Sequence, residues 1–362
     1  MQNAEFRKGL LAALLSSFCI LHSAFGQFAP ALPGYEFSFP RDHGTHDEYR
    51  TEWWYYTGHL HTADGRAYGF ELTFFRVGIS REPAVTRWDL RNLALAHFAI
   101  TDVGARELRY YEKLNRSSAF TASAAAGRLD VFNEAWRATT LPDGAWHIAA
   151  QSGSDAIDLT LRTRKPPAVH GENGVSVKAE GAGYASHYYS MTRLEESGSV
   201  NGRRCTGEAW MDHEFGSSAL RETQQGWDWF SVQLDNETEL MLYVIRRRDG
   251  TPDTTSSGSL VTSDGTVIHL RRDQMRIEPT ARWRSPKSGA TYPMGWRIAV
   301  PQFRIALTLT PLLEDQELVT KQSTQVTYWE GAVGVSGSFA NVAVNGEGYV
   351  EMTGYAKGFR AP

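Results

Sequence analysis

Residues 52–58 read EWWYYTG, four consecutive aromatic side chains between a carboxylate and a Thr-Gly pair. Aromatic residues favour β-strands, and a strand turns successive side chains to opposite faces. Both faces of this strand are therefore aromatic and should both be covered. We expect the first strand of a β-barrel, with one face in the barrel core and the other turned toward a domain junction. One face carries Glu52, Trp54 and Tyr56, and the other carries Trp53 and Tyr55.

The same pattern recurs in the second half of the chain. WWYYTGHL at 53–60 aligns without gaps on WDWFSVQL at 227–234, and each copy is followed by a polar turn and an apolar strand that closes on arginine. Matches repeated in one order indicate an internal duplication. Two further pairs keep that order: DGAWHIAA at 143–150 with MGWRIAV at 294–300, and GAGY at 181–184 with GEGY at 346–349.

The rest of the chain predicts strands and few helices. Short segments of alternating apolar and polar residues, such as YGFELTFFRVG and ELMLYVIRRRDG, are separated by Asp-Gly and similar turn signals. The fold class is therefore all-β, built from two antiparallel units that each roll into a closed or half-open barrel. We place these units at residues 35–215 and 216–362.

The N-terminus predicts export. Arg7 and Lys8 precede an apolar run that ends in Ala-Phe-Gly before Gln27, the layout of a cleavable signal peptide over residues 1–26. Cleavage near Gly26 would release the chain to the periplasm or the medium. The remaining 336 residues keep 35 Lys and Arg against 40 Asp and Glu, a net charge of −5 that argues against a nucleic-acid partner. Only Cys205 remains, so no intramolecular disulfide can form.

Candidate catalytic residues gather in GEAWMDHEFGS, residues 207–217. Asp212 and His213 supply a strong acid and a near-neutral proton carrier, as general acid–base catalysis requires. In an extended strand Trp210 and Asp212 share one face, while His213 lies on the other. Asp228 lies between two tryptophans, so desolvation should raise the pKa of its carboxyl. The alternative is that these acids satisfy turn donors and that the tryptophans are barrel core.

The segment FPRDHGTHDEYRTEWWYY offers several charged groups but no convincing metal site. His43 and His46 on an irregular loop can provide two ligands, yet no downstream ligand spacing completes the set, so we expect no metal. We expect Arg50 and Glu52 to pair with charged groups of the other unit. His97, within an apolar strand, is expected to be a hydrogen-bonded core histidine. The chain shows no nucleophile elbow, phosphate loop or HExxH motif.

Six stretches resemble one known family. The chain is similar to the AttH and carotenoid 1,2-hydratase family of secreted lipocalin-like proteins across roughly residues 37–356. The resemblance implies two calycin-type, lipocalin-like β-barrels in tandem. The motifs that carry it are FPRDHGTHDEYRTEWWYYTGHL, GYASHYYSMTRL, GEAWMDHEFGS, GWDWFSVQLDN, SGATYPMGWRIAVP and GYVEMTGYA.

The resemblance also implies a chemistry. Characterised relatives of the carotenoid branch add water to an isoprenoid double bond without a cofactor, whereas the WMDHEFG spelling here is that of the AttH branch. We therefore expect a hydratase-like enzyme that needs no cofactor and binds an isoprenoid- or polyketide-like molecule at the domain junction. Asp212 or Asp228 would be the acid and His213 the base. The substrate-binding set would be Glu52, Trp54, Tyr56, Tyr188, Trp210, Trp227 and Trp229.

Two other functions compete with this expectation. A non-catalytic carrier would hold a hydrophobic small molecule in the same barrels, with transient association with a membrane or an export system. Such a carrier should tolerate Asp212→Asn and keep its ligand. A true hydrolase is disfavoured because the sequence shows no serine or metal machinery.

Overall fold

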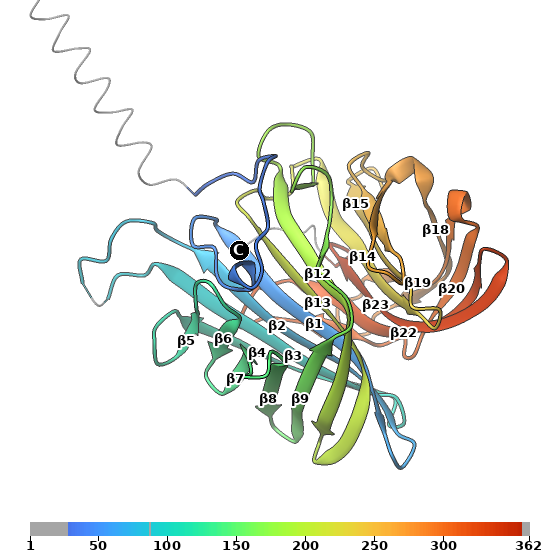
Figure 1. Cartoon of the computed structure of the whole chain (residues 1–362), viewed down its shortest axis with the longest axis horizontal. Helices are drawn as coiled ribbons and strands as arrows, with labels where there is room; N and C mark the ends of the chain where they lie inside the picture. The colour runs from blue at the N-terminus through green and yellow to red at the C-terminus, as the bar shows by residue number, and fades with distance from the viewer. Residues whose placement is uncertain (1–27, 87, 357–362) are drawn as a thin grey trace, which may run out of the picture.

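The computed structural model describes residues 28–86 and 88–356, and the fold is all-β, as predicted (Figure 1). Its helical content in this part consists of three short 3-10 helices, Arg41–His43, Arg272–Gln274 and Pro301–Phe303. None of the described helices is long and apolar enough to span a membrane. The predicted signal peptide, residues 1–26, lies outside the described residues.

The first sheet is antiparallel, and its strands follow the order β4-β3-β2-β1-β13-β12-β9-β8-β7-β6-β5, with β10 and β11 paired to β12. The strands are β1 Thr51–Thr62, β2 Ala67–Gly78, β3 Asn92–Asp102, β4 Glu107–Arg116, β5 Ala122–Ala124, β6 Asp130–Asn133, β7 Trp136–Thr140, β8 Trp146–Ser152, β9 Asp155–Thr163, β10 Ala168–Val169, β11 Ser176–Val177, β12 Ala185–Val200 and β13 Arg203–Gly216.

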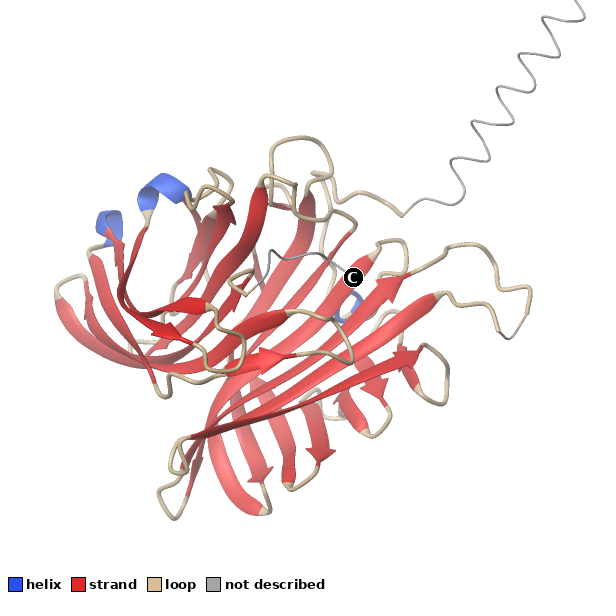
Figure 2. Ribbon diagram, turned by 180° about the vertical axis from the view of Figure 1, so that it is seen from behind, coloured by secondary structure: helices blue, strands red, loops and turns tan. Residues whose placement is uncertain are grey.

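The second sheet follows the order β17-β16-β15-β14-β23-β22-β20-β19-β18, with β21 paired to β22. Both sheets curve strongly and lie side by side (Figures 1 and 2). The strands are β14 Gln224–Leu234, β15 Glu239–Arg247, β16 Ser257–Val261, β17 Val267–Arg271, β18 Arg276–Arg284, β19 Thr291–Val300, β20 Ile305–Pro311, β21 Glu317–Val319, β22 Thr327–Phe339 and β23 Val342–Thr353.

The duplication predicted from the sequence is present in the topology. Nine neighbouring positions in the first sheet, from β4 to β7, match nine in the second, from β17 to β18. The aligned tryptophan stretches fall on β1 and β14, and the second aligned pair falls on β8 and β19. The GAGY–GEGY pairing is wrong, because GAGY at 181–184 precedes β12 whereas GEGY at 346–349 lies within β23, the counterpart of β13.

Each sheet encloses its own apolar core, and a third apolar cluster lies between the sheets. Trp54 and Tyr56 belong to the first barrel core, and Phe230 belongs to the second. Tyr55 and Trp229 belong to the cluster between them. The two faces of the EWWYY strand therefore divide between barrel core and junction, as expected. Cys205 is a free, buried thiol in the first core.

A buried ion network holds the two sheets together. The carboxylate of Glu239, at the start of β15, is fully buried and lies 2.7 Å from Lys165 Nζ and 2.7 Å from Arg193 Nε. Both cations come from the first sheet and its loops. Lys165 also donates to the carbonyls of Glu237 and Thr262, and Arg193 to that of Leu234. These bonds fix the distance between the barrels and so the shape of the space between them.

Candidate functional site

One row of polar side chains crosses the junction face of the first sheet. Tyr55 on β1 lies opposite Asp212 on β13 and opposite Thr73 on β2. Residues directly opposite one another in antiparallel strands share a face. The pairing extends the row in both directions over six strands: Ser190, Asp212, Tyr55, Thr73, His97 and Glu112.

The second sheet presents a matching row from β14, β23 and β22. Glu351 lies opposite both Trp229 and Glu330. Tyr328, two residues before Glu330, lies on the same side of its strand. The two faces are joined directly, since the Tyr55 hydroxyl donates to Glu330 Oε1 at 2.6 Å.

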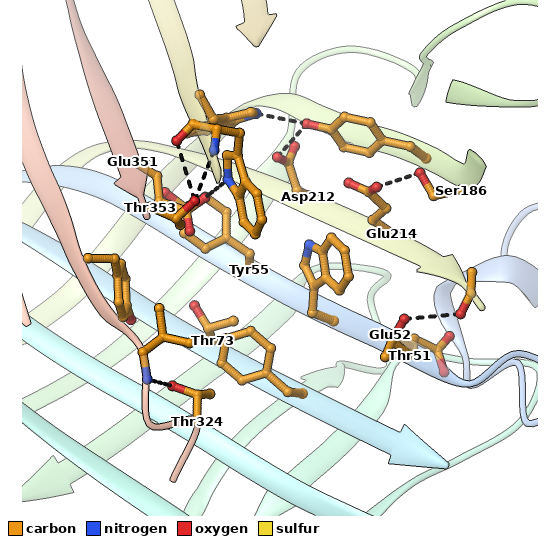
Figure 3. A pocket seen from close by; sticks show the side chains of 18 of the residues that line it. Thr51, Glu52, Tyr55, Thr73, Ser186, Asp212, Glu214, Thr324, Glu351 and Thr353 are labelled. Atoms are coloured by element: carbon orange, nitrogen blue, oxygen red, sulfur yellow. Dashed lines mark hydrogen bonds between the residues drawn. The ribbon is translucent and has the colours of Figure 1, made fainter. Parts of the chain in front are cut away.

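A partly open cavity of about 230 Å³ lies between the two rows, and Figure 3 shows side chains that line it. Aromatic side chains form much of its wall, and carboxyl groups from both sheets point into it. Ser218 and Ala219, in the loop between the sheets, lie at its more exposed edge. The aromatic lining comprises Trp53, Tyr55, Phe75, Tyr188, Trp227, Trp229, Tyr243 and Tyr328, and the carboxyl groups are those of Glu71, Asp212, Glu214, Glu330 and Glu351, with Glu52 at the margin.

Asp212 is held as a hydrogen-bond acceptor by three donors. Tyr188 Oη donates to Oδ2 at 2.6 Å, Trp210 Nε1 donates to Oδ1 at 2.6 Å, and the Ser190 hydroxyl also donates to Oδ1. Trp229 Nε1 in turn donates to the Tyr188 oxygen at 3.0 Å. Burial raises the pKa of Asp212 to about 7, although these three donors lower it. Near neutral pH this carboxyl can therefore release or accept a proton.

Glu330 differs from Asp212 in its hydrogen-bond donors. Its Oε2 is buried, and no donor among the described residues reaches it. Burial, followed by the nearby carboxyls of Glu71 and Glu351, raises the pKa of Glu330 well above its usual range. Burial likewise raises the pKa of Glu351 to about 8 and that of Glu71 to about 7. The cavity thus contains carboxylic acids that stay protonated at neutral pH, because adjacent carboxyls in an apolar site cannot all ionise.

The lysine in the cavity wall does not neutralise this acid group. Lys178 Nζ lies 3.0 Å from Glu214 Oε1 and 4.4 Å from the centre of the Tyr243 ring. Burial lowers the pKa of Lys178, but Glu214, Tyr243 and Asp212 together raise it above its usual value, so the amine stays charged. Glu214 also accepts a bond from the Ser186 hydroxyl. Lys178 and Glu214 therefore form a self-contained ion pair beside Asp212.

The structure corrects which face of the opening strand lines the cavity. Trp53 and Tyr55 line it, whereas Trp54 and Tyr56 are buried in the first barrel core, away from a ligand in the junction. Alternation fixes which residues share a face but not which face meets the second barrel. Trp210 lies on the junction side of the sheet. Its indole N–H donates to Asp212, but the side chain does not line the cavity.

His213 is separated from Asp212 by the sheet itself. Its ring stacks on Trp54 with centroids 4.7 Å apart, Nε2 lies 2.9 Å from Glu52 Oε1, and Nδ1 lies 3.0 Å from the Tyr189 hydroxyl. The prediction that Asp212 and His213 face opposite ways is confirmed. Their assignment as acid and base of one reaction is therefore wrong, because His213 points into the barrel.

Glu52 pairs within its own sheet, not across the junction as expected. Its Oε2 lies 2.9 Å from Arg76 Nε, and its Oε1 lies 2.8 Å from His46 Nδ1. The carboxyl therefore has no free oxygen to offer a ligand in the cavity. Burial raises the pKa of Glu52, but the charge of Arg76 and bonds from His213 and His46 lower it well below its usual range.

His46, Glu52 and His213 are the one described group whose ligand atoms lie close enough to hold a metal ion. The separations from Glu52 Oε1, 2.8 and 2.9 Å, are those of hydrogen bonds. Arg76 already neutralises the same carboxylate, which weakens its attraction for a cation. The cluster is better explained as a proton-holding structural network than as a metal centre.

This network predicts a pH dependence of stability. Burial lowers the pKa of His46, but the hydrogen bonds that its ring donates to the carboxylates of Asp42 and Glu52 raise it to about 9. Because the folded pKa exceeds the ordinary 6.5, His46 contributes stability that is complete below pH 6.5 and is lost as pH rises toward 9. We expect the wild type to lose about 3 kcal/mol more unfolding free energy between pH 6 and 9.5 than His46→Gln does.

Urea unfolding of both proteins at the two pH values measures this difference. Equal losses in the wild type and in His46→Gln would contradict a protonated His46.

Asp228 also lies outside the cavity. Its Oδ1 accepts from Arg246 Nε at 3.0 Å, and its Oδ2 accepts from the Tyr355 hydroxyl at 3.1 Å. Burial raises its pKa as predicted, but the flanking Trp227 and Trp229 lie on the opposite face of β14. A strand residue is not enclosed by its sequence neighbours, because they point the other way.

Of the predicted site residues, the structure brings Asp212, Tyr188, Trp227 and Trp229 together around one cavity, with Glu52 at its margin. Glu330, Glu351 and Glu71 also line the cavity and are not among the predicted site residues. Each is a carboxyl within an apolar strand segment, YWEGA, YVEMT and GFELT, and that contrast is the available signal. His97 is buried with both ring nitrogens hydrogen-bonded, as expected.

Comparisons with known proteins agree with this architecture. The family model described as AttH-like matches residues 30–355. The crystal structure of a protein from Nitrosomonas europaea described as an AttH has a TM-score of 0.81 at 33% sequence identity, over 91% of this chain and 100% of that one. No curated protein matches significantly.

Two other solved structures share the fold at low identity. Kievitone hydratase from Nectria haematococca has a TM-score of 0.69 at 16% identity, over 91% of this chain and 99% of that one. CghA, solved with Sch210972, has a TM-score of 0.53 at 12% identity, over 92% of this chain and 100% of that one.

Proposed function

The chain belongs to the AttH-like family, and on that premise we propose that it is an exported, cofactor-independent hydratase. Its substrate would be an apolar molecule of the isoprenoid or polyketide class, with a trisubstituted alkene held in the junction cavity. The observation that carries the proposal is the cluster of buried carboxyls around Glu330, set in an aromatic wall and facing the triply hydrogen-bonded Asp212. Burial and their mutual proximity raise the pKa of Glu330 well above its usual range.

The reaction would begin with proton transfer from Glu330 to the less substituted alkene carbon. The C=C π bond breaks, a C–H bond forms, and a tertiary carbocation remains beside the Glu330 carboxylate. Trp53, Trp227 and Trp229 line the cavity, and the face of an aromatic ring stabilises such a cation. Water then adds to the cation, and Asp212 takes the proton that water releases. The product is a tertiary alcohol.

The two carboxyls suit these different roles because their surroundings differ. Within the described part of the chain, Glu330 has one side-chain donor and one buried oxygen that no donor reaches, which favours the acid form. Asp212 has three donors, which favour the carboxylate. Environments that separate the protonation states of two carboxyls are a recurring basis for assigning acid and base. We retain Asp212 as a catalytic candidate, with the role of base rather than acid.

Heavy-oxygen labelling tests the proposal. The purified full chain is incubated in H₂¹⁸O with a series of phenols that carry a dimethylallyl or geranyl group, and products are examined by mass spectrometry. We expect a tertiary alcohol that contains one heavy oxygen. Compounds extracted from protein purified from its own host are assayed in the same way, which extends the search beyond the chosen phenols.

The same experiment separates an enzyme from a carrier. A carrier binds the phenol or the extracted compound unchanged, and Asp212→Asn leaves that binding intact. The hydratase binds in both forms but loses turnover in Asp212→Asn. Tight binding with no heavy oxygen incorporated by the wild type would favour the carrier.

A further inference from the structure

We propose that a hydrogen-bonded relay through Ser323, His97 and Tyr328 carries protons from Glu112, at the edge of the first sheet, to Glu71 in the cavity. The relay rests on the proposed function only for its purpose, which is to restore the acid after each turnover. Its existence as a proton path depends only on the hydrogen-bond distances between these five side chains. It would run between the two barrels, so neither barrel contains it alone.

The contacts form an unbroken chain. Ser323 Oγ donates to Glu112 Oε2 at 2.6 Å, and His97 Nε2 lies 2.8 Å from Ser323 Oγ. His97 Nδ1 lies 2.6 Å from the Tyr328 hydroxyl, and that hydroxyl lies 3.3 Å from Glu71 Oε1. Ser323 and Tyr328 belong to the second barrel, whereas the other three groups belong to the first.

The chain can be hydrogen-bonded in two directions that differ by one proton moved from end to end. In the first, Glu71 is protonated and each group donates toward Glu112, which is ionised. In the second, Glu112 is protonated and each group donates toward Glu71, which is ionised. Each hydroxyl and the imidazole gains one proton and loses one, so the interior groups end neutral in both states.

The surroundings favour the first direction at rest. The backbone N–H groups of Gln322 and Ser323 donate to Glu112 Oε2 at 3.0 and 2.8 Å, which stabilises a carboxylate at the partly exposed end. Burial raises the pKa of Glu71 to about 7 at the inner end. Burial also lowers the pKa of His97 to about 3, so the ring passes protons as a neutral tautomer.

A second histidine chain in the same junction lacks an outlet. From Asp212, Ser190 connects to His170 Nε2 at 2.6 Å, and His170 Nδ1 connects to Ser259 Oγ at 2.9 Å. Ser259 is fully buried. Within the described residues, the chain from Glu71 is therefore distinguished by ending at a partly exposed carboxylate.

The relay would supply protons while an apolar ligand occupies the cavity. An apolar occupant excludes water from the carboxyls, so a Glu330 that has given up its proton cannot recover it from the cavity side. Glu71 lies beside Glu330, since β2 packs on β22 and the charge of Glu71 raises the pKa of Glu330. Glu112 takes up a proton from solvent and passes it along the relay to Glu71, which can therefore restore the Glu330 acid. Asp212 returns the proton that it took from the attacking water to solvent when the product leaves the cavity.

A photoacid pH jump followed by time-resolved infrared spectroscopy tests the relay without any turnover. Glu71→Gln identifies the carboxyl band of Glu71 in the full-length protein. We expect Ser323→Ala to slow protonation of that band at least tenfold, to leave its equilibrium titration midpoint in place, and Ser323→Thr to restore the rate. Thr324→Val, in the same loop and on the cavity wall, is the matched control and should keep the wild-type rate.

Each outcome decides the question. A rate unchanged in Ser323→Ala means that protons reach Glu71 through the cavity mouth, and the relay is overturned. A slower rate together with a shifted titration midpoint assigns Ser323 a structural role only, which also overturns it. Neither result bears on hydration itself, which the heavy-oxygen experiment decides separately.

Discussion

Glu330→Gln is expected to lower kcat on the order of a thousandfold while the protein still binds its ligand. The carboxamide has nearly the same shape and still accepts the hydrogen bond from Tyr55, so the cavity wall should stay intact. What it lacks is an acidic proton on the buried oxygen. Because that proton is needed only when the alkene is attacked, the loss should appear in kcat and not in KM.

Two companion variants make this result specific. Glu347→Gln changes a carboxylate on the same strand as Glu351, but at a partly exposed position 3.1 Å from His61, and should leave turnover unchanged. Tyr55→Phe removes the one side-chain donor to Glu330 among the described residues and should have a smaller effect than Glu330→Gln. Full activity in Glu330→Gln would move the acid to another cavity carboxyl, with Glu351 the first to test.

Arg193→Met is expected to destabilise the fold by about 3–5 kcal/mol, the largest stability effect that we predict for a single substitution. The substitution removes a cation 2.7 Å from Glu239, whose carboxylate is fully buried between the sheets. It also leaves the Leu234 carbonyl without its guanidinium donor. A buried charge that loses one of its two cationic partners cannot recover the hydration it gave up on folding.

Urea unfolding followed by tryptophan fluorescence measures this loss, and a combined variant provides the control. Replacing Lys165, Arg193 and Glu239 together by methionine removes all three charges, so most of the stability should return. If the triple variant is as unstable as Arg193→Met, lost packing explains the effect and not an orphaned charge. If the triple variant recovers its stability, ligand binding by that variant would show whether the cavity depends on these charges or only on the distance between the two barrels.

The sequence by itself determined the architecture of this protein. Alternating apolar residues and Asp-Gly turns predict antiparallel strands, and the repeated tryptophan stretch predicts two copies of one unit. Both predictions hold, because strand pairing within each barrel depends on local pattern and on short connections. The sequence also predicted that Asp212 and His213 face opposite ways and that Trp227 and Trp229 belong to a common aromatic site.

Only the tertiary structure decided which face of each strand became the site. Alternation pairs Trp53 with Tyr55 and Trp54 with Tyr56, but both pairs are aromatic, so no polar contrast shows which pair lies in the barrel.

The carboxyl groups of the cavity also could not be identified as one site from the sequence, because they are far apart along the chain. Glu71, Asp212, Glu330 and Glu351 come from four strands and two barrels, and each reads separately as one carboxyl in an apolar segment. Their pKa values rise because docking the barrels removes water from all of them at once and places their charges side by side. That physical cause exists only after the two sheets meet, so no pattern within a single strand contains it.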